Sequence, residues 1–146
     1  MFGKKILEIT DKFWVKTEFY GKIKRIDHDV YHHGLKPNVK MKNVKGFKGY
    51  YTFCTDNHGF RYKCNSDQRG KKFDYAFMGD SFTEGSSVSY EDSFVGIFEN
   101  ISKKKVVNLG VVSYAPKIYL SKINYYLNKG YKFDHVIIPI DISDLY

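Results

Sequence analysis

A repeating order of short apolar runs and helical patterns in the second half of the chain constrains its fold most. Three apolar runs, at 74–78, 106–110 and 135–140, are separated by stretches with helical spacing. Short apolar runs bounded by glycine or charged residues are typical of buried strands. Because the connections are long enough for parallel crossovers, the pattern predicts a β-α-β-α-β unit built on a parallel sheet.

Both connecting stretches carry helix signals. In the first, Ser89 precedes two acidic residues and is expected to cap a helix. Its apolar residues recur at i, i+3, i+4 and i+7 and should face the sheet: Phe94, Ile97, Phe98 and Ile101. In the second, Pro116 should open a helix that ends before Gly130. Its apolar stripe would be Tyr119, Ile123 and Leu127.

Three residues follow the three predicted strands, namely Ser81, Gly110 and Asp141. Parallel strands all end at the same edge of a sheet, and α/β proteins place their sites at that edge. We therefore expect these residues to gather there although they are far apart in the sequence.

The serine belongs to the stretch FMGDSFTEG at 77–85. Its flanking glycines permit a tight turn that would present Ser81 as a nucleophile, and Asp80 could fix the turn by accepting amide hydrogen bonds. The alternative is an ordinary turn serine after a strand. Thr83 and Glu84 could line a pocket, but solvated turn residues are the expectation.

The segments FMGDSFTEG, VVNLGVVSYAP and VIIPIDISD, in this order, resemble the first three sequence blocks of the SGNH, or GDSL-like, hydrolase superfamily. The segments RIDHDVYHHGLKPN and YYTFCTDNHGFR resemble the upstream part of relatives associated with bacterial envelope polysaccharides. The resemblance implies a three-layer α/β/α flavodoxin-like fold and acyl-ester chemistry without a cofactor or a metal.

The resemblance also implies roles for individual residues. Ser81 would attack the ester carbonyl, and the backbone amides of Ser81 and Gly110 would hold the oxyanion. The family's third block usually adds an asparagine, but Ile140 stands at that position here, with Asp141 beside it in a role that the family does not supply. Asp80 and Asn108 are further candidates for the substrate-binding site, although Asn108 could equally be an ordinary residue at a strand end.

The family's Asp-x-x-His pair, which supplies the general base, has no counterpart before Tyr146. The resemblance therefore predicts the N-terminal part of an SGNH domain over 73–146, truncated after the third strand and preceded by a basic α+β segment over 1–72 that packs on or beside it. An upstream base or a metal site could be drawn from three histidines, but we expect them to form hydrogen bonds within that segment: His28, His32 and His33.

Positive charge is concentrated in the first half. Residues 1–72 carry 17 Lys and Arg against 7 Asp and Glu, whereas residues 73–146 carry 7 against 9. Such a surplus can attract nucleic acid, but no RNA-binding motif accompanies it, so nucleic acid is not the expected partner. No signal-peptide core or membrane-length apolar run is present in the sequence, which predicts a cytoplasmic location by default.

Two features of the first half carry structural expectations. Cys54 and Cys64 lack the close spacing of a metal or redox motif and are expected to be reduced, with a disulfide as the alternative. The aromatic stretches 49–53 and 58–62 should form a hairpin or loop beside the site, with Arg61 on the surface.

The sequence thus favours an esterase or O-acyltransferase that acts on a small acyl ester or an acylated carbohydrate. The main alternative is a carbohydrate-binding or scaffold domain without catalysis. A basic nucleic-acid-binding protein is the weaker alternative.

Overall fold

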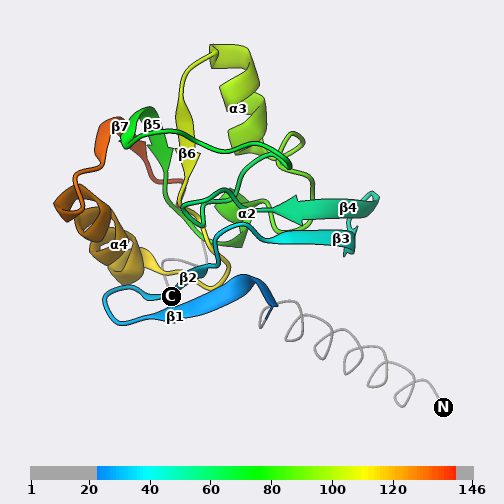
Figure 1. The fold of residues 1–146 in the computed structure, drawn as a ribbon, viewed down its shortest axis with the longest axis horizontal. Coiled ribbons are helices and arrows are strands. Elements are labelled where there is room, and N and C mark those ends of the chain that lie inside the picture. The colour runs from blue at the N-terminus through cyan, green and yellow to red at the C-terminus, as the bar shows by residue number, and fades with distance from the viewer. Residues whose placement is uncertain (1–22, 141–146) are drawn as a thin grey trace.

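The computed structural model describes residues 23–140 and has a mixed α/β fold (Figure 1). Its three-stranded parallel sheet has the order β6-β5-β7, with β5 (Lys72–Phe77) between β6 (Val106–Asn108) and β7 (Lys132–Ile137). The predicted parallel sheet is therefore confirmed. The third strand begins three residues earlier than expected and forms an edge whose side chains are mostly exposed.

The helix between β5 and β6, α3 (Phe94–Ser102), differs from the prediction in its cap and in its buried face. Ser93 caps it by accepting a hydrogen bond from the Gly96 amide at 3.1 Å, whereas Ser89 donates to Asp92 in the preceding turn. The expected stripe was wrong, because Ile97 and Ile101 are 46% and 76% exposed.

Gly96 explains which face of α3 is buried. A side chain at this position would collide with the Tyr90 carbonyl oxygen, so the backbone of α3 lies directly against Tyr90 at Gly96. Val95, next to it, is fully buried, and Phe98 packs partly against the same cluster.

Helix α4 (Pro116–Asn128) begins at the predicted proline. Tyr119 is buried and Ile123 packs on the core, as expected, but Leu127 is 46% exposed. The buried face instead continues through Lys122 and Tyr126.

The first half forms two antiparallel hairpins. Strand β1 (Arg25–His28) pairs with β2 (His32–Leu35), and β3 (Lys40–Gly46) pairs with β4 (Gly49–Cys54). Of the two alternatives expected for 49–53 and 58–62, a hairpin or a loop, the structure has the loop, since only an isolated bridge joins Thr55 to Arg61.

Asp56 gives the physical reason for the missing hairpin. Its carboxylate accepts hydrogen bonds from the amides of His58 at 2.9 Å and Phe60 at 2.8 Å, which closes a compact turn in place of a ladder. Beyond the turn, Cys64 returns to Cys54 with a Cα–Cα distance of 5.2 Å, and the two form a disulfide. The expectation of reduced cysteines was wrong, because sequence spacing does not reveal that the chain doubles back here.

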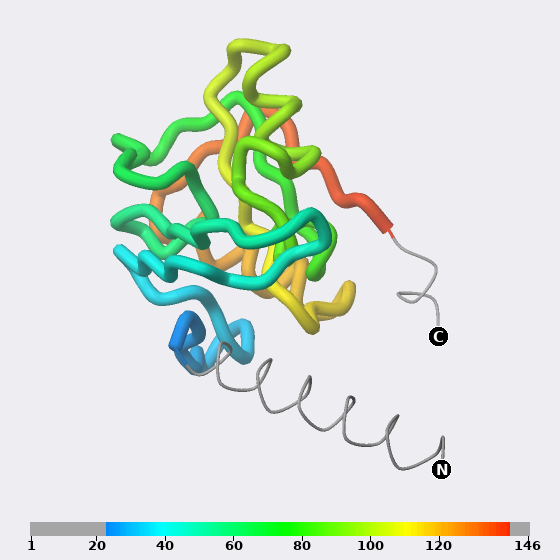
Figure 2. Tube along the Cα trace, turned by 90° about the vertical axis from the view of Figure 1, so that its right-hand side faces the viewer, coloured from blue at the N-terminus to red at the C-terminus, as the bar shows by residue number. Residues whose placement is uncertain are grey.

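Two core clusters lie against the sheet. The larger combines sheet residues with α4 and both hairpins, and the smaller joins the sheet to α3. Figure 1 shows the two helices on either side of the strands, and Figure 2 shows the blue-to-teal hairpins packed on the same body. The larger cluster contains Tyr31, Leu35, Met41, Val44, Phe53, Phe60, Phe73, Ala76, Met78, Val107, Leu109 and Tyr119 among others.

No helix within residues 23–140 has the length and apolar character needed to cross a bilayer.

Candidate active site

The serine turn follows directly from the central strand. After β5 ends, the chain enters the one-turn helix α2 (Ser81–Glu84), and the Asp80 carboxylate caps it by accepting from the Phe82 amide at 2.9 Å. Gly85, in the left-handed conformation at φ 68°, closes the turn. Ser81 is half-buried, and its hydroxyl forms no hydrogen bond to any residue in 23–140.

Two glycines let neighbouring segments close on Thr83. A Cβ at Gly110 would lie 2.7 Å from the Thr83 Cβ and 2.8 Å from the Glu84 amide nitrogen. A Cβ at Gly79 would overlap the Thr83 hydroxyl. The end of β6 therefore lies directly against the serine turn, as the expected gathering of strand ends requires.

Asn108 links these two segments. Its side-chain amide donates to the Thr83 carbonyl at 2.6 Å, while its side-chain oxygen accepts from the Gly110 amide at 3.0 Å. Asn108 is buried, so both contacts are shielded from water. The Gly110 amide is thus already engaged, whereas no residue in 23–140 accepts a hydrogen bond from the Ser81 amide.

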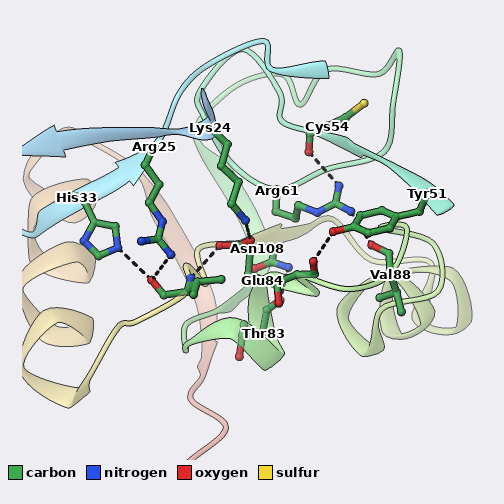
Figure 3. Close-up of polar contacts among 12 residues, drawn as sticks. Lys24, Arg25, His33, Tyr51, Cys54, Arg61, Thr83, Glu84, Val88 and Asn108 are labelled. Carbon is green, nitrogen blue, oxygen red and sulfur yellow. Dashed lines mark hydrogen bonds and ion pairs between the residues drawn. The ribbon is translucent and has the colours of Figure 1, made fainter. Parts of the chain in front are cut away.

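Glu84 is fully buried, so the expectation that it would be a solvated turn residue was wrong, as it was for Thr83. Its carboxylate forms an ion pair with Lys24 and accepts a hydrogen bond from the Val112 amide at 2.8 Å (Figure 3). The chain folds this way because a buried carboxylate is tolerated only where charged or amide donors satisfy it. Lys24 and Val112 lie far from Glu84 in the sequence.

Arg61 is also fully buried and not at the surface. Its guanidinium donates to the carbonyls of Cys54, Tyr62 and Val88, and it lies 4.3 Å from the centre of the Phe53 ring. Burial lowers the pKa of Arg61, and the nearby Glu84 carboxylate opposes that effect. Arg61 thus joins the disulfide loop to the loop that follows the serine turn.

Lys122 is a third buried cation near this edge. It is 2% exposed and donates to the Leu109 carbonyl, at the end of β6, at 2.8 Å. Burial lowers its pKa to about 7, and Glu84 partly opposes the change. One carboxylate, that of Glu84, therefore interacts electrostatically with Lys24, Arg61 and Lys122.

The N-terminal histidines lie on the β1–β2 hairpin, where His28 is opposite His32. His33 is near the site, but both of its ring nitrogens have partners, the Val112 carbonyl at 3.1 Å and His32 at 2.7 Å. Burial lowers the pKa of His33. No histidine within residues 23–140 forms a hydrogen bond with Ser81, and no group of metal-ligating side chains occurs there.

Ile140, at the predicted third-block position, is 65% exposed beyond the end of β7. Asp141 lies outside the described residues. The structure brings together the turn of Ser81, Asp80, Asn108 and Gly110, and it adds Glu84, Lys24 and Arg61, whose role the sequence did not indicate.

Comparisons with known proteins provide no family for the chain: no family model matches it, and no curated protein matches it significantly.

Proposed function

We propose that the chain is a serine esterase or O-acyltransferase of the SGNH type, with Ser81 as its nucleophile. The observation that carries the proposal is the position of Ser81, on a capped turn at the carboxyl end of the central parallel strand with an unpaired hydroxyl. A core cluster against each helix is consistent with the three-layer flavodoxin-like fold of that superfamily. The proposed substrate is a small acyl ester or an acylated carbohydrate.

In the proposed reaction, the Ser81 oxygen attacks the ester carbonyl while its proton passes to a general base. The unengaged Ser81 amide stabilises the oxyanion, and donors of this kind typically contribute a few kcal/mol. Collapse of the intermediate breaks the ester C–O bond, the base returns its proton to the leaving oxygen so that the alcohol departs, and an acyl group remains on Ser81. Water then releases the acid, or a sugar hydroxyl accepts the acyl group.

Two groups must complete this site. The Gly110 amide would serve as a second donor only if it also left or shared its bond to Asn108. No group within residues 23–140 is hydrogen-bonded to the Ser81 hydroxyl, so the general base must be a residue outside this range or a histidine that leaves its present hydrogen-bond partners.

The test is covalent labelling of the whole chain. A fluorophosphonate should modify Ser81, and p-nitrophenyl acetate should be hydrolysed, with Ser81→Ala lowering the rate at least about a hundredfold. Ser87→Ala, which removes another half-buried hydroxyl of the same loop, should leave the rate unchanged. Full activity in Ser81→Ala, or no labelling of Ser81, would refute the proposal.

One observation favours a second candidate, a carbohydrate-binding domain without catalysis. The Gly110 amide is occupied by Asn108, and no histidine within residues 23–140 is hydrogen-bonded to Ser81. This candidate predicts saccharide binding that Ser81→Ala does not alter, together with no ester hydrolysis.

A further inference from the structure

A hollow of about 450 Å³ lies between the β1–β2 hairpin, the His58–Gly59 turn and α4. Ser81 and Gly110 are not among the residues that line it, so it is separate from the serine turn. Figure 1 shows α4 beside the hairpin at this side of the molecule. A hollow of this size is within the range of small-molecule sites.

The walls of the hollow are aromatic. Tyrosines come from the β1–β2 hairpin, from α4 and from the position just before β7, and two histidines accompany them. They form a continuous set of ring contacts, including His28 stacked on Tyr31 at 3.6 Å and Tyr126 packed edge-on against Tyr131 at 5.0 Å. Such walls combine flat apolar surfaces with hydroxyl and ring N–H groups, which suits a ring-shaped ligand with many hydroxyls.

The charge of the lining is positive. Lys71, Lys122 and Lys129 line the hollow, and no acidic residue does. Lys71 and Lys129 are exposed at its rim, at 5.4 Å and 5.5 Å from the centres of the Tyr131 and Tyr125 rings. Lys122 lies deeper, and its only hydrogen-bond partner in 23–140 is the Leu109 carbonyl.

A buried lysine without a directly bonded carboxylate is costly, and an anionic group in the hollow would offset that cost. Three acids act electrostatically on lining residues from outside the hollow: Asp29 on His28, Asp56 on Tyr131 and Glu84 on Lys122. The lining of the hollow is therefore positive and aromatic, and no carboxylate of the described residues lies within it.

We infer that this hollow binds a saccharide that carries an acidic group. The tyrosines and histidines would contact the sugar rings and their hydroxyls, and Lys122 and Lys129 would pair with the carboxylate, sulfate or phosphate. This inference does not rest on the proposed esterase activity, because none of the catalytic candidates lines the hollow.

The test is calorimetric titration of the whole chain with digalacturonate, its dimethyl ester and inorganic phosphate. We expect digalacturonate to bind and the uncharged ester to bind at least about tenfold more weakly, the magnitude of one charge-assisted hydrogen bond. Binding of both sugars with equal affinity would overturn the anionic requirement. Binding of phosphate as tight as that of digalacturonate would overturn the requirement for a sugar.

Substitutions then locate the site. Lys129→Gln should weaken digalacturonate binding about tenfold, whereas Lys117→Gln, at an exposed lysine of α4 outside the hollow, should change it less than twofold. Equal effects of the two substitutions, or no binding of digalacturonate to the unmodified chain at millimolar concentration, would refute the site. Since Lys129 is exposed, its substitution should leave the fold intact, and thermal unfolding checks this.

Discussion

At the scale of single residues, Glu84 ties the serine turn to two parts of the chain that lie far from it in the sequence. One oxygen of its carboxylate pairs with Lys24 and the other accepts from the Val112 amide, so the turn is tied to the first half of the chain and to the loop after β6. Arg61 adds a further buried positive charge nearby. Removal of one partner of such a buried pair leaves the other charge uncompensated.

Glu84→Gln should therefore lower the free energy of unfolding by about 3–5 kcal/mol, because Lys24 and Arg61 would be left buried without a carboxylate. Urea denaturation at pH 7 measures the change. Asp134→Asn, which removes an equal charge at an exposed position, is the matched control and should alter stability by less than about 0.5 kcal/mol. A similar small effect of both substitutions would show that Glu84 is not held by charge.

The position of Ser81 could be predicted from the sequence, since a buried strand followed by GDS determines where the turn falls. The burial of Glu84 could not, because Thr83-Glu84-Gly85 has the composition of a solvated turn. Its partner Lys24 is 60 residues away. The same holds for Arg61, whose acceptors come from three separate backbone positions that only the folded chain brings together.

At the scale of elements, α3 shows why an apolar stripe does not by itself identify a buried face. The stripe of Phe94, Ile97 and Ile101 is partly or mostly exposed, and the innermost positions are Val95 and Gly96. Helical periodicity was sufficient to predict that a helix lies here. It could not reveal the close contact between Gly96 and the Tyr90 carbonyl, which turns the helix.

This orientation predicts that two truncations in α3 lower the free energy of unfolding by unequal amounts. Val95→Ala should destabilise the protein by about 2 kcal/mol, because it opens a cavity at a fully buried site. Ile101→Ala, which removes a larger side chain at a 76% exposed site, should cost less than about 0.5 kcal/mol. Chemical denaturation of both variants measures the two losses in the free energy of unfolding. A larger loss for Ile101→Ala would mean that the originally expected stripe is the buried one.

At the scale of the whole molecule, the sequence predicted the order β-α-β-α-β and the parallel pairing of the strands. It did not predict that the two hairpins and the sheet share one core. The charge division at residue 72 suggested two segments. The larger core cluster nevertheless combines hairpin residues with sheet residues, and the buried Glu84–Lys24 pair crosses the same division. Composition reports where charge lies on the chain, but it does not report which apolar faces cover one another.

The shared core predicts that residues 73–146 do not fold alone. Their removal from residues 1–72 would expose the sheet face covered by Tyr31, Leu35, Phe53 and Phe60, all of which are buried. Each large side chain contributes about 1.5–3 kcal/mol by burial, so the four together contribute roughly as much as the whole stability of a typical domain, about 5–15 kcal/mol. Circular dichroism of the 73–146 fragment in increasing urea should show no cooperative transition, whereas the whole chain should unfold in a single step. A sigmoidal transition in the fragment would instead make 73–146 an independent domain and the first half an accessory to it.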